Sequence, residues 1–408
     1  MKYLIVYCGH DDSTSANGVC VWNLARELKG RGHEVWVIWQ FKKDIFKEFE
    51  KEGIHCYGVR ESWFYTFTQW HKKHRNILAD LFYNFVSFLR LFYVMPFYPN
   101  VSPWVALKCS FLANTIVRKN KLDRVVGIYM PYDAIKTTIR LKKKYKDNLY
   151  VANYHLDLIN SPINANRFVK GYKLWKGKLA VKHELALVDR MLLPMSAKNT
   201  IKDDKIKYVD FPLFVRNPNN LLSDFVFPSD CINITYIGSL DKSNRNPSFA
   251  LTLIKKCIEL TSKKIIVNVW GNLADIETRD IIKGFDFVAY HGLVENMYVQ
   301  DLLSRSDFLL NVSNAVTYNM IPSKIFQQFS MHKPIINIVR HREDSSLKYF
   351  TKYPNVINIQ EYSPSEKDLL SMLDFLTIKD SQSIKYNDDV YIESTPGYIC
   401  NLIDDNTL

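Results

Sequence analysis

The sequence lacks the features that would place it outside the cytoplasm. It has no uncharged apolar run of 18 or more residues, the length that a transmembrane helix needs. Residues 1–6 enter a strand-like apolar run without the charged and apolar regions of a signal peptide. The seven cysteines are scattered, with no Cys-x-x-Cys pair. We therefore expect a cytoplasmic protein with neither disulfides nor a structural zinc site.

Two kinds of functional motif are also missing. No RNP-like, zinc-finger or helix-turn-helix pattern occurs, so nucleic-acid binding is discounted. The acidic pairs at 11–12, 203–204 and 404–405 are loop or terminal residues, and none is an Asp-x-Asp motif that follows a strand. The formal net charge of +12 nevertheless indicates an anionic partner, either nucleotide phosphates or lipid headgroups.

The length and the hydrophobic pattern predict two α/β domains. A chain of 408 residues, 47% hydrophobic, is too long for one ordinary core. Strand-length apolar runs alternate with helical patterns, and the first strand, loop, helix and second strand form a β-α-β unit. The predicted strands are 3–7, 34–39, 125–129, 149–154 and 191–193, then 232–237, 264–270, 287–290, 308–312 and 334–339. Parallel sheets with Rossmann-like connections are expected in both halves.

Prolines and asparagines between residues 212 and 228 interrupt this alternation and mark the interdomain connection. We predict an N-terminal domain over 1–212 and a C-terminal domain over 213–390. Residues 391–408 are predicted to form a helix that returns to the N-terminal domain. Ligands of parallel sheets bind at the carboxyl ends of the strands, so the cleft between the two halves is the expected site.

Residues 71–104 depart from the alternation. A broad apolar stripe at helical spacing runs from 77 to 93, with the basic run 71–75 before it and an aromatic stretch after it. An aromatic amphipathic helix with cationic flanks suits an anionic membrane surface. The same stripe is expected of a helix that packs on its own sheet. Both interpretations remain open, and the first would make the protein a peripheral one at the inner face of the cell membrane.

The most informative segment for chemistry is 319–327, where Pro322 and Ser323 suit the first turn of a helix. Lys324 would then lie in that first turn, where the helix dipole disfavours a cation. A bound diphosphate would reverse this penalty, because helix N-termini and lysine both favour phosphate oxygens. On these grounds alone Lys324 is equally well a solvated surface lysine.

The order of the motifs resembles GT-B glycosyltransferases similar to family 4. Segments 322–327 and 331–336 are similar to the family's "PSK-[IL]-F-E-Y" and "G-K-P-[IV]-I" signature. Further matches follow in the family's order: Asn17-Gly18, Arg31–Val35, Ile237–Leu240 with Arg245–Pro247, Trp270-Gly271, His291-Gly292 and Ser306-Asp307. The resemblance covers nearly the whole chain. It implies two Rossmann-like domains and transfer of a sugar from a nucleoside-diphosphate donor, without a cofactor or a metal.

The resemblance also assigns roles in the C-terminal half. It implies that Arg245 and Lys324 grip the donor diphosphate. The other implied donor-binding positions on this side are Gly238, Ser239, Asn246, Gly271, Asn319, Ser323 and Gln327. Asn319 and Gln327 stand where the family usually has acidic residues. Gln327 keeps an acceptor for the ribose hydroxyls, so the contacts to the donor sugar are more in doubt than those to the nucleotide.

In the N-terminal half, Asn17 and Gly18 would bring backbone N–H groups to the phosphates or to the sugar. His155 follows a predicted strand and resembles the family's cleft-facing histidine, which we expect to contribute to catalysis. Glu184 matches a family glutamate of less clear role. The resemblance favours retention of configuration, in which the departing phosphate accepts the proton of the acceptor. An inverting reaction would need a base, for which His10 is the candidate.

Two alternative functions remain. The missing acidic residues suggest a non-catalytic accessory subunit, and a GT-B sugar-nucleotide epimerase would release a new UDP-sugar without an acceptor. Uracil as the donor base is the family's usual choice. If residues 71–104 touch a membrane, the acceptor is a lipid-linked saccharide, as in bacterial surface-polysaccharide synthesis. Otherwise a glycan is the expected acceptor.

Overall fold

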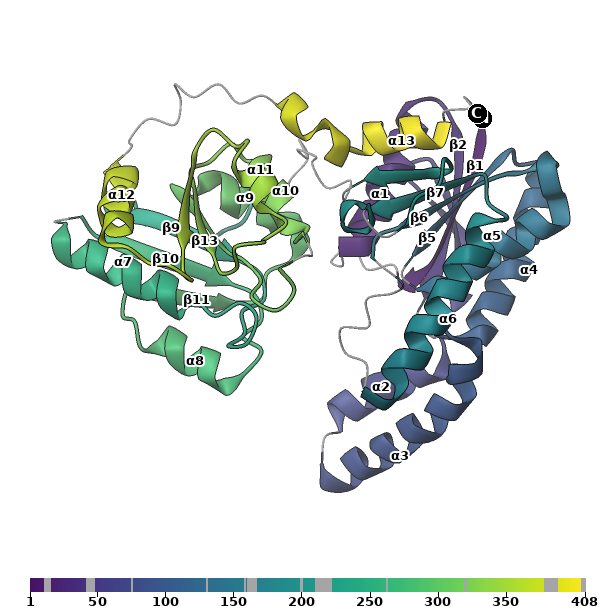
Figure 1. Cartoon of the computed structure of the whole chain (residues 1–408), viewed down its shortest axis with the longest axis horizontal. Helices are drawn as coiled ribbons and strands as arrows, with labels where there is room; N and C mark the ends of the chain where they lie inside the picture. The colour runs from purple at the N-terminus through teal and green to yellow at the C-terminus, as the bar shows by residue number, and fades with distance from the viewer. Residues whose placement is uncertain are drawn as a thin grey trace. The chain divides into compact units, whose positions relative to one another are not determined.

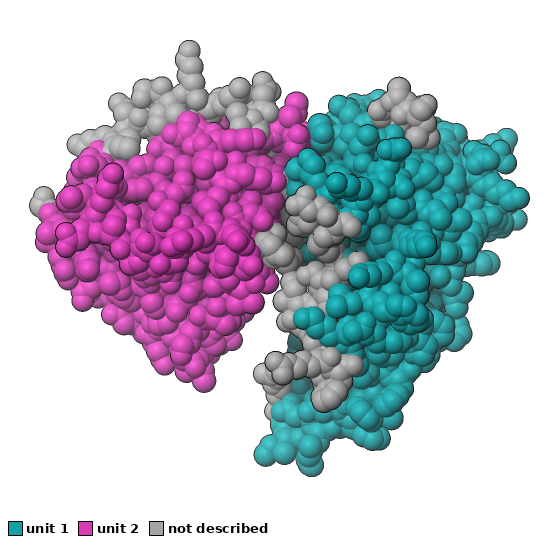
Figure 2. Space-filling view, viewed as in Figure 1, with its two compact units in different colours: residues 1–212, 396–408 teal, residues 213–395 magenta. Residues whose placement is uncertain are grey.

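The computed structural model describes residues 1–10, 16–41, 48–74, 76–129, 131–157, 159, 167–198, 201–209, 222–261, 263–318, 321–377 and 388–404. The chain forms two compact units (Figure 2). Unit 1 comprises Met1–Pro212 together with Pro396–Leu408, and unit 2 comprises Leu213–Thr395. Residues 210–221, the first part of the predicted interdomain connection, lie outside the described residues.

Unit 1 is built on an eight-stranded sheet in the order β3-β4-β2-β1-β5-β6-β7-β8. Its strands are β1 Lys2–His10, β2 Glu34–Phe41, β3 Glu48–Lys51, β4 Ile54–Arg60, β5 Arg124–Tyr129, β6 Tyr150–His155, β7 Arg190–Pro194 and β8 Ile206–Val209. Only the pairing of β3 with β4 is antiparallel. Seven of the eight residues of β2 are buried, as expected for a parallel strand that is covered on both faces.

Helices cover both faces of this sheet (Figure 1). They are α1 Ala16–Gly30, α2 Trp63–Lys73, α3 Ile77–Val94, η1 Met95–Phe97, α4 Pro103–Asn120, α5 Tyr132–Tyr145, η2 Lys146–Asn148, α6 Arg167–Leu185, η3 Met195–Ala197 and α13 Pro396–Asp404. The strand order reverses beside β1, so right-handed connections put α1 on one face and α4 and α5 on the other. Leu4 and Val6 of β1 share a core with Val105 and Cys109 of α4.

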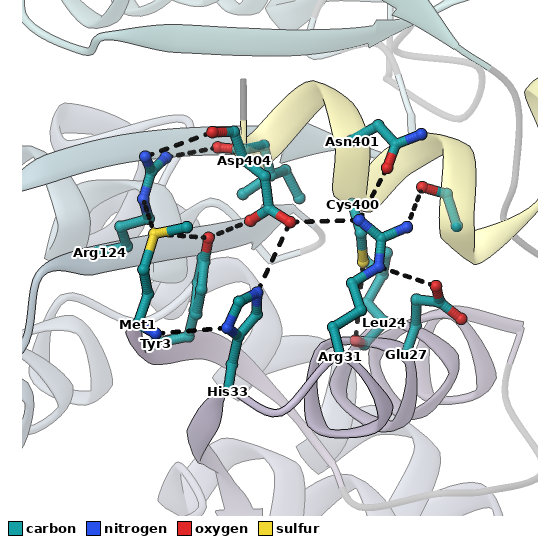
Figure 3. A network of polar contacts seen from close by, with 12 residues as sticks. Met1, Tyr3, Leu24, Glu27, Arg31, His33, Arg124, Cys400, Asn401 and Asp404 are labelled. Atoms are coloured by element: carbon teal, nitrogen blue, oxygen red, sulfur yellow. Dashed lines mark hydrogen bonds and ion pairs between the residues drawn. The ribbon is translucent and has the colours of Figure 1, made fainter. Parts of the chain in front are cut away.

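The C-terminal helix α13 belongs to unit 1, where it packs on α1 (Figure 3). Arg31 donates hydrogen bonds to Asn401 Oδ1 and to the carbonyl of Gly397, both at 2.7 Å. Arg124 at the start of β5 donates to the carbonyl of Ile403 at 2.7 Å. The chain therefore returns to unit 1 from Pro396 onward. The short helix η5 (Asp388–Ser394) stays on unit 2, where Tyr391 stacks on Phe329 at 4.8 Å.

Unit 2 has a six-stranded parallel sheet in the order β11-β10-β9-β12-β13-β14. Its strands are β9 Ile232–Ile237, β10 Ile265–Trp270, β11 Val288–Gly292, β12 Phe308–Val312, β13 Ile335–Val339 and β14 Val356–Gln360. Its α-helices are α7 Ser248–Leu260, α8 Ile276–Lys283, α9 Asn296–Arg305, α10 Lys324–Phe329, α11 Leu347–Phe350 and α12 Glu366–Thr377. The two parallel-sheet units confirm the predicted α/β class.

The strands predicted from sequence are all present, within one to three residues at their ends. The prediction missed β3, β4, β8 and β14. These lie at or near the edges of the two sheets, where the apolar runs are short and half-exposed. Local hydrophobic pattern is weakest there, because only part of each edge strand is buried.

Candidate functional site

The strand order of unit 2 reverses between β9 and β12, which lie side by side although three helices and two strands separate them in sequence. In open parallel sheets the connections diverge at such a point and leave a crevice at the carboxyl ends of the strands. Gly238 follows β9, and Asn314 comes shortly after β12. This edge of the sheet is therefore the candidate ligand site of unit 2.

Two glycines let the backbone loops at this edge approach each other closely. Gly238 has φ +151° and Gly271 has φ +132°, conformations that side chains of L-residues rarely adopt. The amide of Gly238 donates to the carbonyl of Trp270 at 2.9 Å. A Cβ atom on Gly271 would lie 1.9 Å from the carbonyl oxygen of Gly238. Glycine is therefore required at Gly271 by contact with backbone that cannot move aside.

Lys324 points to the same edge. Its Nζ donates to Tyr236 Oη at 2.8 Å and lies 4.2 Å from the centre of the Tyr236 ring. A Cβ atom on Gly238 would come within 2.7 Å of this Nζ. Among the described residues no carboxylate pairs with Lys324. Burial, and secondarily the charge of Arg245, lower the pKa of Lys324 well below its usual value.

Arg245 lies in the loop that leads into α7 and is half-buried. Its Nε donates to Asn314 Oδ1 at 2.7 Å, which ties the loop after β9 to the loop after β12. In the part of the chain that the structure describes, Arg245 has no carboxylate partner either. Arg340 provides a contrast, because its Nε is neutralised by Glu361 at 2.7 Å. Lys324 and Arg245 thus interact at this edge without a counter-charge among the described residues. A bound anion would neutralise both.

The other predicted donor-side residues that the structure describes lie in the loop after β9 or on and next to α10. Ser239 Oγ donates to the carbonyl of Asn272 at 3.3 Å, and Asn246 Oδ1 accepts from the amide of Ser248 in the first turn of α7. Ser323 takes the N-cap position of α10 without a side-chain capping bond, as the sequence predicted for a helix start there. Gln327 lies half-buried on α10. Asn319 lies outside the described residues.

Unit 1 has an equivalent reversal of strand order between β1 and β5. His10 is the last residue of β1, and its side chain is outside what the structure describes. Asn17 and Gly18 lie in the first turn of α1. Their positions at the carboxyl end of β1 suit a ligand at the switch point of this sheet. The contacts proposed for these three residues remain predictions.

His155 is held inside unit 1. It is 1% exposed, and its Nε2 lies 2.7 Å from Glu184 Oε1. The same carboxylate oxygen accepts a hydrogen bond from Asn153 Nδ2 at 2.8 Å, and Glu184 is fully buried. Nδ1 of His155 has no hydrogen-bond partner among the described residues. The structure thus gives Glu184 a clear role in holding His155, whereas the catalytic role of His155 remains a prediction.

Sequence reasoning missed two members of the site in unit 2. Tyr236 is a buried strand residue, 88 positions away from the lysine that it contacts, and nothing in the sequence pairs the two. Asn314 follows a central strand at its carboxyl end, so the switch-point rule could have identified it. Among the described residues, no group of three or more His, Cys, Asp or Glu side chains could hold a metal ion.

Solved structures show that the fold is GT-B. The chain is similar to UDP-GlcNAc 2-epimerase from Methanocaldococcus jannaschii (11% identity, TM-score 0.53, 99% of each chain covered). It is also similar to an E. coli trehalose-6-phosphate structure bound with UDP-2-fluoro glucose (10% identity, TM-score 0.54, 99% of each chain). A third match is a glycosyltransferase from Rickettsia africae (12% identity, TM-score 0.52, 98% of this chain and 95% of the other).

Neither a family model nor a curated protein matches this sequence. At identities of 10–12%, the matched structures establish the fold and leave the reaction to be argued from the site. Resemblance to family 4 in particular remains a prediction from the motifs.

Proposed function

We propose that the chain is a retaining glycosyltransferase that needs no metal and whose unit 2 holds the diphosphate of a UDP-sugar. The observation that carries this proposal is the pair Lys324 and Arg245. The two cations interact, lack carboxylate partners among the described residues, and lie at a glycine-lined switch point. A diphosphate supplies the missing negative charge, and the E. coli neighbour with this fold binds a UDP-sugar analogue.

The same two cations provide the chemistry of transfer. When the bond between sugar and diphosphate breaks, negative charge grows on the β-phosphate, and fixed cations lower the barrier most if they stand where that charge develops. Tyr236 orients the ammonium group of Lys324, and Asn314 orients the guanidinium of Arg245. In the retaining reaction the departing phosphate oxygen takes the proton of the acceptor hydroxyl.

We further propose that the acceptor is a lipid-linked saccharide used in surface-polysaccharide synthesis, and that segment 71–104 contacts an anionic membrane on the cytoplasmic side. The support is the basic and aromatic composition of this segment. A glycan acceptor in solution would not use such a segment.

The second candidate function is epimerisation of a UDP-sugar. Its specific support is the similarity to UDP-GlcNAc 2-epimerase. The TM-score of that match is 0.53, and the TM-score of the match to the glycosyltransferase is 0.52. A site that grips the diphosphate serves both reactions, because both hold a UDP-sugar by its nucleotide. The two reactions differ in their products: transfer consumes an acceptor and releases UDP, whereas epimerisation inverts a carbon of the sugar and releases a new UDP-sugar.

A product assay separates these functions. Purified protein incubated with UDP-sugars and a polyprenyl-diphosphate-linked saccharide is expected to release UDP only when the acceptor is present. A new UDP-sugar that forms without acceptor would favour the epimerase. No product with any of a panel of UDP-sugars, despite measurable UDP binding, would favour the accessory subunit. Lys324→Ala is the control for contaminating activity, since it should lose whichever activity is genuine.

The lowered pKa of Lys324 predicts that diphosphate binding is coupled to proton uptake. Between this lowered pKa and the ordinary value of 10.5, the unfolded chain binds a proton that the folded protein does not, so the free energy of unfolding rises with pH across that window. A bound diphosphate favours the ammonium form and raises the pKa again. In the same window, UDP titrated in buffers of different ionisation enthalpy should show uptake of up to one proton, which Lys324→Ala abolishes. Equal heats in all buffers would contradict this coupling.

A further inference from the structure

Helix α3 turns its apolar side away from the protein. Its large apolar residues Ile77, Leu78, Leu81, Phe82, Phe85, Phe88, Leu89 and Phe92 are between 51% and 80% exposed. At about 100° per residue, these eight positions fall within an arc of about 140° on one side of the helix. A helix of a globular protein normally buries such an arc. In α3 the apolar arc is exposed instead.

The opposite side of α3 carries its polar groups and faces α2. Asp80 lies 2.5 Å from His71, and the ring of Tyr83 stacks on the same histidine at 4.2 Å. Near the other end of α3, the guanidinium of Arg90 lies 4.0 Å from the centre of the Phe64 ring. The inner side is only partly packed, because a cavity of about 580 Å³ lies between α2, α3 and α4. The unit therefore holds α3 mainly by its polar side. On the apolar side Phe82 packs edge-on against Phe67 of α2 at 5.6 Å, and the eight residues stay more than half exposed.

By length and composition α3 and the turn after it could cross a membrane, although no uncharged apolar run of 18 residues occurs in the sequence. The segment Ile77–Phe97 has 21 residues, a mean hydropathy of 1.5 and only 6% of its most apolar window buried. The two charged residues that break the apolar run in the sequence are Asp80 and Arg90. Both lie on the side that faces α2, so they do not interrupt the outward surface.

The neighbours of α3 determine how it can meet a bilayer. Helix α2 runs antiparallel beside it, with contacts at His71 near one end of α3 and at Phe64 near the other. A helix that spans the membrane would carry α2, with Lys72 and Lys73 at its end, into the hydrocarbon. The chain also returns through α4, which packs on α5 and β1 of the same unit. A helix lying in the plane of the interface avoids both penalties.

The sequence on both sides of α3 has more cations than acids. Residues 62–108 contain five Lys or Arg and one acidic residue, Asp80, which is paired with His71. Exposed Lys72 and Lys73 lie just before α3. Beyond its other end, Lys176 of α6 donates to the carbonyl of Pro96 at 3.2 Å and lies 5.7 Å from the Trp175 ring. Lysine beside tryptophan at the rim of an apolar surface suits the headgroup region of an anionic bilayer.

We propose that the outward side of α3 inserts into one leaflet of an anionic membrane, with the helix axis parallel to the surface and the flanking lysines at the phosphate level. The charge pattern favours an anionic membrane over a second copy of the chain. A second copy of the chain would bring the two sets of lysines together, whereas anionic headgroups neutralise them. This inference deepens, and rests on, the membrane contact proposed above for segment 71–104. It can be tested apart from the reaction, because it concerns unit 1 alone.

Flotation with vesicles tests the proposal. The full chain is expected to float with phosphatidylcholine vesicles that contain 30% phosphatidylglycerol, and at least tenfold less with phosphatidylcholine alone. Phe85→Glu/Phe88→Glu, on the outward side, should lower flotation with anionic vesicles at least tenfold. Lys72→Glu/Lys73→Glu should lower it several-fold and remove most of its salt dependence. Matched controls are Leu260→Glu/Leu293→Glu and Lys255→Glu/Lys256→Glu, which alter exposed residues of unit 2 and should float like wild type.

Orientation is tested with an environment-sensitive fluorophore on Leu78→Cys or Phe92→Cys, each in a Cys231→Ser background because Cys231 is the one cysteine of the chain that is not buried. Spin-labelled lipids should quench both positions, and a third probe on Phe85→Cys at the middle of α3, at the same shallow depth, whereas a spanning helix would place the middle probe near the bilayer centre. Wild type that stays with the bottom fraction would overturn the proposal, as would an α3 variant that floats unchanged. A dimer in analytical ultracentrifugation that Phe85→Glu/Phe88→Glu dissociates, without vesicle binding by wild type, would show that a second copy covers this face.

Discussion

Lys324→Ala is expected to weaken UDP binding at least tenfold, a loss of about 1.4 kcal/mol in binding free energy. The ammonium group stands beside Arg245 at the carboxyl edge of the sheet in unit 2, where burial and that neighbour disfavour its charge. A bound diphosphate reverses this penalty. The variant therefore loses a charge-assisted contact to the phosphate, and it also loses the neutralisation of the Lys324–Arg245 repulsion that binding provides in wild type. Calorimetric titration of UDP, GDP and ADP without added metal measures the effect and identifies the base.

Lys264→Ala provides the matched control for this experiment. Lys264 precedes β10 at the opposite, amino edge of the same sheet and pairs there with Asp230 at 3.1 Å. The Lys264→Ala variant removes the same charge from the same unit. Unchanged UDP affinity in this variant would therefore show that the loss of affinity in Lys324→Ala is local. Arg245→Ala should also weaken binding, and the two losses should not add, because the residues act on one ligand. Equal UDP affinity in Lys324→Ala and wild type would overturn the donor site. No binding of any nucleotide to wild type would favour the accessory subunit.

Glu184→Ala should destabilise unit 1 by about 2–5 kcal/mol. Glu184 Oε1 is the shared partner of His155 Nε2 and Asn153 Nδ2, and all three side chains are at most 1% exposed. Removing the carboxylate leaves two buried polar groups without a partner and creates a cavity in the same place. Denaturant unfolding followed by tryptophan fluorescence reports on unit 1, since seven of the eight tryptophans lie there.

Glu184→Gln is the control, because it keeps the volume and one acceptor oxygen. We expect it to cost less than half as much as the alanine variant. A change below about 0.5 kcal/mol in Glu184→Ala, the size of an ordinary surface substitution, would show that the buried network contributes little. Residual activity in folded Glu184→Ala would also bear on His155, whose catalytic role requires its ring to be held in place.

Much of unit 2 could be predicted from local sequence, because its central strands are predominantly apolar. Strands β9, β10, β12 and β13 are almost entirely buried, so each one is mostly hydrophobic, although each also contains a buried asparagine. Lys324 was also identifiable, since a cation in the first turn of a helix opposes the helix dipole. On that basis alone a solvated lysine was equally acceptable.

The partners of these residues could not be predicted in the same way. Tyr236 reaches Lys324 and Asn314 reaches Arg245 only because β9 and β12 are neighbours in the sheet. His155 shows the same limit in unit 1. Its place at a strand end suggested an exposed role, and the structure buries it against a glutamate from α6. Strand order is a property of the whole sheet, and no local pattern encodes it.

By itself, the sequence determined the two α/β units, the absence of a paired-cysteine framework, and an apolar, aromatic helix over residues 77–93 that follows a basic run. Helix and strand periods are local, so a single sequence carries them. Only the tertiary structure decided which way that helix faces. An apolar stripe looks the same in sequence whether it is buried or exposed, and the contacts of Asp80, Tyr83 and Arg90 with α2 turn it outward. Which side of a helix is buried depends on its neighbours in space, because burial is a property of packing and not of composition.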